Sequence, residues 1–186
     1  APGTPAAPGG RRPVLGVPVG PYLDQAPPAT LAAFETQVAR LSAAGYEVRR
    51  EPVLADIAGI NRRHRDLIAA EIAEAHAPWF DAYAARYRPR TAALVREGRA
   101  VVPAALADAR ASGRVLRAAL EAAMDERAID VWISPAAPGP APVGLASTGD
   151  PAMNLPWTHA GLPTLTLPAG RLDGLPVGLQ CAARTM

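Results

Sequence analysis

The sequence contains no lysine, so all 19 of its basic residues are arginine. Arginine stays protonated at any working pH, and its side chain therefore cannot serve as a general base. The parallel excess of Ala, Gly and Pro makes a bias in genomic base composition the simplest reason for this replacement. With 17 acidic residues the formal net charge is only +2, which argues against a dedicated nucleic-acid binder.

Cysteine is almost as scarce as lysine. The single thiol, Cys181, cannot form an internal disulfide, and no group of residues has the spacing of metal ligands, so we expect neither a metal nor another cofactor. No apolar run approaches the roughly twenty residues that cross a bilayer, and the N-terminus lacks a signal-peptide core. These features predict a soluble, cytoplasmic protein that does not engage a membrane.

The length of 186 residues suits one domain with a real core and is too short for two comfortable ones. Residues 1–10 (APGTPAAPGG) have nothing to bury and are predicted to form a flexible linker, which leaves 11–186 as the domain. The apolar fraction is 49%, but much of it is alanine, so bulky core material is thinner than that value suggests.

The N-terminal part of the domain has the pattern of a strand, a helix and a second strand. Residues 12–19 and 46–53 are predicted strands, and Pro28 opens the helix between them, because proline suits a first helical turn. Gly45 supplies the C-terminal cap. One helix face carries apolar residues at helical spacing, namely Leu31, Phe34, Val38 and Leu41. This order predicts a βαβ unit with a parallel strand pair.

From residue 56 to about 127 the pattern is helical. One amphipathic helix, which runs out near Pro78, is marked by Ile57, Ile60, Leu67, Ile68 and Ile72. An aromatic stripe predicted to pack in the core follows, made of Trp79, Phe80, Tyr83 and Tyr87. A long later helix begins at Pro103 and is marked by Leu106, Leu116, Leu120 and Met124.

The C-terminal part alternates strands with turn residues. Residues 129–133, 162–167 and 175–182 are predicted strands, and a Pro-rich irregular loop is expected over 135–148. The last two strands could pair as a hairpin or occupy separate places in a sheet. We expect all three in one sheet, with Val131 and Leu165 buried.

The segment from Met153 to Gln180 carries an ordered set of turn motifs. They are Asn154, Pro156, Gly161-Leu162-Pro163, Pro168-x-Gly170 and Gly174-Leu175-Pro176-x-Gly178-x-Gln180. The segment resembles the C-terminal end of the amidase signature family, hydrolases that cleave amide C–N bonds. DVWISPAAP, from residue 130, is similar to the family's strand that leads into a Pro-rich loop. The resemblance implies an α/β fold with a mixed β-sheet flanked by helices, and it makes 11–186 the C-terminal part of a single amidase domain.

The chemistry that the resemblance implies is not in this chain. Members of the family use a Ser–cis-Ser–Lys triad beside a Gly/Ser-rich loop whose N–H groups stabilise the oxyanion. This chain has no lysine, and its four serines, Ser42, Ser112, Ser134 and Ser147, lie outside any Gly/Ser-rich run. We therefore expect a fragment whose N-terminal catalytic part is missing, with no catalytic residue of its own. The small-molecule amide substrate would belong to the full-length enzyme. The start at Ala1 fits a fragment, although a removed initiator methionine would look the same.

Two other interpretations come from different classes of protein. The chain could be a non-catalytic amidase-like remnant that serves as a binding or regulatory protein. An arginine-mediated nucleic-acid module is disfavoured by the near-neutral charge. In a fragment, a sheet edge would be left unpaired, which predicts self-association, and an apolar stripe made of Leu116, Leu120 and Met124 could face water.

Four residues are candidates for the substrate pocket, because the family's N-x-P and G-L-P region shapes the acyl side of the site. They are Asn154, Trp157, Thr158 and His159. A structural alternative stays open for each, in which Asn154 caps a helix and Trp157 fills the core.

Other chemically suggestive residues have simpler interpretations. Ser147, Asp150 and His159 form a nominal Ser/His/Asp set, but such sets arise by chance and only geometry identifies a real triad. His64 and His76 are predicted to be solvated. The thiol of Cys181 is expected in a buried strand. The cluster of Arg62, Arg63 and Arg65 could contact phosphate, but acidic residues at 66, 71 and 74 favour an ordinary charged helix face.

Overall fold

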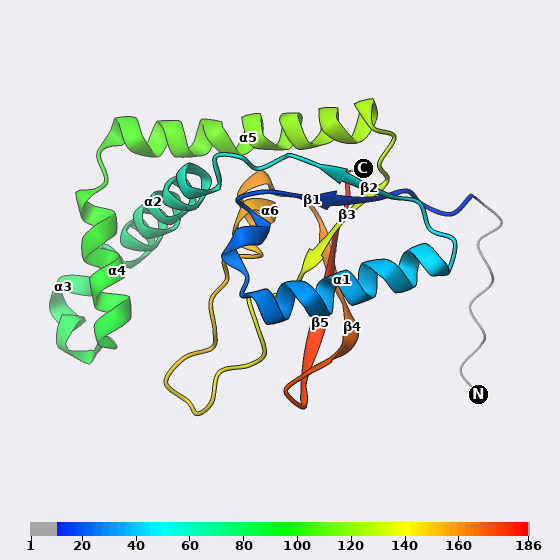
Figure 1. Cartoon of the computed structure of the whole chain (residues 1–186). Coiled ribbons are helices and arrows are strands. Elements are labelled where there is room, and N and C mark those ends of the chain that lie inside the picture. Colours follow the sequence, from blue (N-terminus) through cyan, green and yellow to red (C-terminus); the bar gives the residue numbers. More distant parts are fainter. Residues whose placement is uncertain (1–10, 186) are drawn as a thin grey trace, which may run out of the picture.

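A computed structural model describes residues 11–185 as one five-stranded mixed sheet flanked by helices (Figure 1). The strand order is β2-β1-β3-β5-β4, in which β2, β1 and β3 are parallel while β5 and β4 are antiparallel to their neighbours. The strands are β1 (Leu15–Pro18), β2 (Val48–Glu51), β3 (Val131–Pro135), β4 (Thr164–Leu172) and β5 (Leu175–Ala182). The expected α/β fold class is confirmed. The linker predicted over 1–10 lies outside the described residues.

The N-terminal unit is the predicted βαβ arrangement. Helix α1 (Pro28–Ala43) connects β1 to β2, which pair in parallel with Leu15 opposite Val48. The helix begins at a proline because its first turn needs no N–H from that residue, and it packs Phe34 and Val38 into the core. Strands β1 and β2 are shorter than the predicted ranges 12–19 and 46–53, because the two strands pair with each other only over four residues each.

The middle of the chain forms the helices that the periodicity predicted, with one addition. They are α2 (Ile57–His76), α3 (Phe80–Tyr83), α4 (Pro89–Ala100) and α5 (Pro103–Glu126), with short 3₁₀ turns at Leu23–Gln25 and Ala84–Arg86. Figure 1 shows α5 along the top of the molecule, and α2 contacts both α4 and α5. The sequence did not single out α4.

Two expectations about these helices were wrong in whole or in part. The stripe on α5 does not face water, because Leu120 and Met124 are fully buried in the main core cluster and Leu116 packs against that cluster. Of the aromatic stripe, only Phe80 is buried, in a small cluster around α2 and α4, whereas Trp79 and Tyr83 are exposed and Tyr87 is half-buried.

The last two strands form a hairpin, which is one of the placements that the sequence left open. On its other side β5 pairs with β3, so the hairpin is also joined to a strand from an earlier part of the chain. Asp173 and Gly174 make the turn with positive φ values of 51° and 78°. Val131 is half-buried, but the prediction that Leu165 is buried was wrong, since 62% of it is exposed. The reason is that β4 is the edge of the sheet and is covered on neither face from residue 164 to 168.

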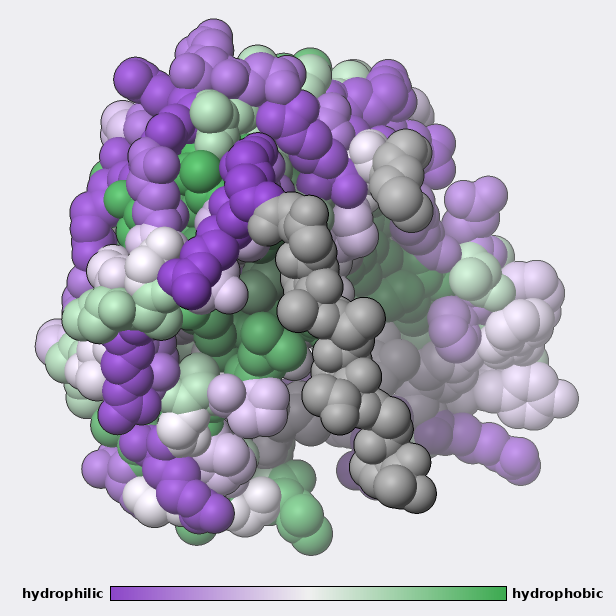
Figure 2. Space-filling view, turned by 90° about the vertical axis from the view of Figure 1, so that its right-hand side faces the viewer, coloured by the Kyte–Doolittle hydropathy of each residue, from purple (hydrophilic) through white to green (hydrophobic). Residues whose placement is uncertain are grey.

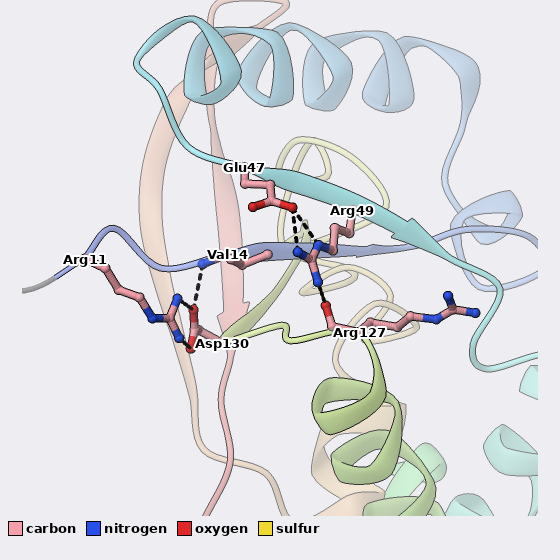
Figure 3. A network of polar contacts seen from close by, with 6 residues as sticks. All are labelled: Arg11, Val14, Glu47, Arg49, Arg127 and Asp130. Atoms are coloured by element: carbon pink, nitrogen blue, oxygen red, sulfur yellow. Dashed lines mark hydrogen bonds and ion pairs between the residues drawn. The ribbon is translucent and has the colours of Figure 1, made fainter.

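A network of polar contacts holds the starts of the parallel strands together (Figure 3). Asp130 accepts two hydrogen bonds of 2.7 Å from Arg11 and a third of 2.7 Å from the backbone N–H of Val14. These bonds hold the pKa of Asp130 below its ordinary value, chiefly through Arg11. On the other side of β1, Arg49 pairs with Glu47 and donates to the carbonyl of Arg127. The network fixes β1 between its two neighbours.

Candidate functional site

A cavity of about 430 Å³ lies between α1, the loop that follows β3, and the start of β5. Its lining is mostly apolar and includes Phe34, Pro138, Val177 and Leu179. The loop is irregular, as the sequence predicted, and is tied down at two points. Thr30 Oγ1 donates to the carbonyl of Pro138 at 2.6 Å, and Asn154 Nδ2 donates to the carbonyl of Ala136 at 3.1 Å.

The polar groups in the cavity are few, and two of them are already engaged. Thr30 is committed to the loop, and the carboxylate of Asp150 accepts the backbone N–H of Ala152 at 2.9 Å. The other polar side chains among the lining residues are Gln37 and Thr148. The cavity therefore offers apolar volume, as ligand pockets commonly do, but its own lining presents no activated nucleophile.

The pocket candidates sit on or next to α6 (Leu155–Ala160), a short helix that the strand-like pattern around it concealed. Asn154 occupies the N-cap position, but its side chain makes no cap bond and instead holds the loop beside the cavity. Trp157 is buried, Thr158 is exposed, and His159 is buried. None of the four lines the cavity. The structure thus places Asn154 one contact away from the cavity wall and the other three farther along α6.

Trp157 belongs to a buried polar network centred on Tyr22, a residue that no sequence pattern singled out. Its indole Nε1 donates to the Tyr22 hydroxyl at 2.9 Å, and the two rings meet edge to face at 5.7 Å. The same hydroxyl lies 2.9 Å from Ser134 Oγ and 2.8 Å from the carbonyl of Met153. Burial raises the pKa of Tyr22 to about 12, so the phenol stays protonated and fixes α6 against β3.

His159 does not join the nominal set with Ser147 and Asp150. Its Nε2 lies 2.7 Å from Ser112 Oγ on α5, while Ser147 accepts the N–H of Gly149 and Asp150 that of Ala152. The ring of His64 on α2 packs edge to face with His159 at 5.4 Å.

The prediction that His64 is solvated was wrong, since only 5% of it is exposed. His64 lies on the same face of α2 as Ile57 and Ile60, the face that turns inward. His76 is half-buried and bonds the Tyr87 hydroxyl at 2.7 Å, so it too is less open to water than predicted.

The arginine cluster and the cysteine have ordinary surroundings. Arg63 pairs with Asp56 at 3.0 Å and Arg65 with Glu97 at 2.7 Å, which makes this a charged helix face with partners other than those the sequence suggested. Cys181 is half-buried rather than fully buried, and burial raises the pKa of its thiol. Within residues 11–185, no three His, Cys, Asp or Glu side chains gather as a metal site would require.

Comparison with known proteins decides the family. The model of the family described as Amidase matches residues 6–186. The chain belongs to the amidase signature family. A solved structure described as an amidase superposes with a TM-score of 0.82 at 28% identity. A bacterial aryl acylamidase of the same family superposes with a TM-score of 0.74 at 12% identity, a likeness that shows the fold alone.

Curated relatives match over shorter stretches. A glutamyl-tRNA(Gln) amidotransferase subunit of Pseudomonas fluorescens is 40% identical over 77 residues, which are 38% of this chain and 16% of that protein. The corresponding subunit of Exiguobacterium sibiricum is 45% identical over 58 residues, 27% of this chain and 12% of that protein. The superposition with the solved amidase covers 92% of this chain and 42% of the amidase's own chain. The chain thus spans less than half the length of these proteins that it resembles. Within its described part, none of the helices has the length and apolarity needed to cross a bilayer.

Proposed function

We propose that this chain is the C-terminal portion of an amidase-signature hydrolase that acts on carboxylic amide C–N bonds. The observation that carries the proposal is the family match over residues 6–186, supported by a superposition that covers 92% of this chain and 42% of a solved amidase. The strand order agrees with a partial sheet, because β4 ends it with a long uncovered edge.

The contribution of this portion is one wall of the substrate site. The apolar cavity beside the loop suits the acyl part of an amide, and two of its polar side chains, Thr30 and Asp150, are occupied by bonds that hold its shape. Asn154 acts as a positioning residue, since its amide fixes the loop. Trp157 fixes α6 through its hydrogen bond to Tyr22. Thr158 is exposed to solvent, whereas the side chain of His159 is on the buried face of α6.

The chain alone does not hydrolyse amides. Amide hydrolysis needs a nucleophile, a base that activates it and donors for the oxyanion. The sequence has no lysine, and of its four serines Ser134 and Ser147 are bonded to a phenol and to a backbone N–H. Ser112 contacts a histidine but also donates to the carbonyl of Ala109 at 2.9 Å, which takes up its only proton.

The test is an assay of the purified chain with an aryl amide, with Ser112→Ala and Ser147→Ala variants as matched controls. We expect no turnover above the uncatalysed rate in any of the three proteins. Turnover in the parent chain that is abolished by either substitution would overturn the proposal and locate the nucleophile. A specific ligand bound without turnover, and with no stabilisation by the rest of an amidase, would instead support the non-catalytic remnant.

We also propose that the free edge of β4 drives self-association of the isolated chain. The backbone N–H of Ala183 bonds the carbonyl of Pro163 at 3.0 Å, and Leu165 is opposite Cys181. Because bonding directions alternate along an antiparallel pair, Pro163, Leu165 and Leu167 bond toward β5 while Thr164 and Thr166 bond outward. An outward row of backbone groups flanked by exposed leucines is a template for another strand. On the face turned to the viewer in Figure 2, patches of apolar surface (green) lie among polar side chains.

A further inference from the structure

Two buried imidazoles meet where α2, α5 and α6 converge. His64 of α2 is 5% exposed and His159 of α6 is 8% exposed, and their rings pack edge to face at 5.4 Å. Among residues 11–185, neither Nδ1 atom of the two buried rings has a hydrogen-bond partner. Contact between Gly113 of α5 and the carbonyl of His159 is so close that an added Cβ would lie 2.6 Å from the oxygen. The junction is tightly packed and leaves little room for water.

The bonds of Ser112 indicate the proton state of His159. The hydroxyl has one proton, and the carbonyl of Ala109 can only accept it. The proton between Ser112 Oγ and His159 Nε2 must then come from the imidazole. His159 therefore carries a proton at Nε2, and in the neutral ring its Nδ1 is unprotonated and buried beside His64. Protonation would place a charged N–H at this Nδ1, where no acceptor lies within reach.

The charged groups around the junction do not offset such a charge. On α2, Arg63 lowers the pKa of His159 and Glu71 raises that of His64, but burial is the largest effect on both rings and lowers both pKa values. On α5, Arg117 donates to the carbonyls of Ala160 and Gly161. On α4, Glu97 is paired with Arg65, and α6 itself has no charged residue other than the histidine.

We propose that His64 and His159 form an acid-sensitive junction, in which protonation of the imidazoles releases α6 from α2 and α5. The pKa of each ring is lower in the folded chain than its ordinary value of 6.5, chiefly because of burial. The stability they contribute is therefore complete above about pH 6.5 and is lost as the pH falls below it. Since Asn154 at the start of α6 holds the loop beside the cavity, the loop loosens with the helix. The junction would act in this way whether or not the proposed function holds.

The experiment is hydrogen exchange of the full 186-residue chain, followed by mass spectrometry at pH 7.5, 6.5 and 5.5 with correction for intrinsic exchange. We expect the protection of residues 155–160 to fall by about threefold or more between pH 7.5 and 5.5. In His159→Gln, whose amide can still donate to Ser112, this pH response should become clearly smaller, because only His64 remains to be protonated at the junction. The matched control is His76→Gln, which removes the one histidine that lies outside the junction. In this variant the protection of α6 should still fall with pH as in the unaltered chain.

A second measurement covers the case in which His159→Gln does not fold. An NMR titration of the imidazoles in the unaltered chain should show two rings that resist protonation near pH 6.5 and are protonated only as α6 loses protection. Protection of α6 that does not change with pH, or a response of undiminished size in His159→Gln, would overturn the proposal. So would ordinary titration of all three histidines with α6 still protected.

Discussion

At the scale of single residues, the buried polar groups of this chain fasten particular elements rather than perform chemistry. The Tyr22 hydroxyl joins the turn after β1 to Ser134 on β3 and Trp157 on α6. Asp130 joins β1 to β3 at their starts through Arg11 and Val14. A hydrogen bond of this kind contributes little when it is made, but the loss of one partner leaves another polar group buried without compensation.

Replacement of Tyr22 by phenylalanine should therefore destabilise the chain. The change keeps the ring but leaves the indole N–H of Trp157 buried without an acceptor, so we expect the free energy of unfolding to fall by about 2 kcal/mol. Urea unfolding followed by circular dichroism measures this. Tyr87→Phe is the matched control, since that hydroxyl bonds His76 at a half-buried site and should matter less. Equal losses of unfolding free energy in the two variants would show that the buried network around Tyr22 contributes no more to stability than the half-buried bond of Tyr87.

At the scale of elements, each helix is defined by the face that it buries. Helix α5 turns Leu120 and Met124 into the main core cluster while Val115 stays 68% exposed, and α2 turns His64 inward on its apolar face. Strand β4, by contrast, stays exposed from Thr164 to Pro168. The same kind of apolar pattern thus ends in full burial on one element and in exposure on another.

Truncation of Leu120 to alanine tests whether α5 is part of the core of this chain. Leu120 is 1% exposed and packs in the main core cluster, so its loss should lower the free energy of unfolding by about 3 kcal/mol. The matched control on the same helix, Val115→Ala, should change it by about 0.5 kcal/mol or less. Thermal or urea unfolding gives both values. A small effect of Leu120→Ala would mean that α5 does not pack into the core in solution.

At the scale of the whole molecule, the core is continuous around the inner strands of the sheet, and the sheet ends in an exposed edge strand, β4. Strands β1 and β3 are central and their side chains are mostly buried, whereas β4 is last in the order and exposes Leu165 and Leu167. Such an edge favours association with another strand, either from a second copy or from the rest of an amidase.

Thr166→Pro should suppress self-association without unfolding the chain. Thr166 directs its backbone N–H away from β5, so proline removes an outward donor and spares the hairpin. Leu165→Pro is the matched control, because its N–H faces β5 and its loss should disrupt the strand pair. Sedimentation velocity of the three proteins at increasing concentration makes the comparison. We expect higher-order species in the unaltered chain and fewer in Thr166→Pro, as well as suppression by an added N-terminal amidase portion. A monodisperse unaltered chain would count against association through this edge.

Local sequence was sufficient for many of the elements and for the family, but not for α4 and α6. Helices that begin at Pro28 and Pro103, the turn at Asp173-Gly174 and strand β5 all follow from periodicity and turn chemistry, because these depend on residues a few positions apart. The ordered turn motifs after Met153 indicated the amidase family, which the match over residues 6–186 shows.

Only the tertiary structure decided which apolar and polar side chains are covered. Leu165 alternates like a buried residue yet lies on an uncovered edge, and His64 resembles a surface residue yet meets His159, which is 95 positions away in the chain. The link between Asn154 and the loop beside the cavity was equally invisible. The physical reason is that burial and hydrogen bonding depend on which elements pack together, and the pattern within any one element does not contain that information.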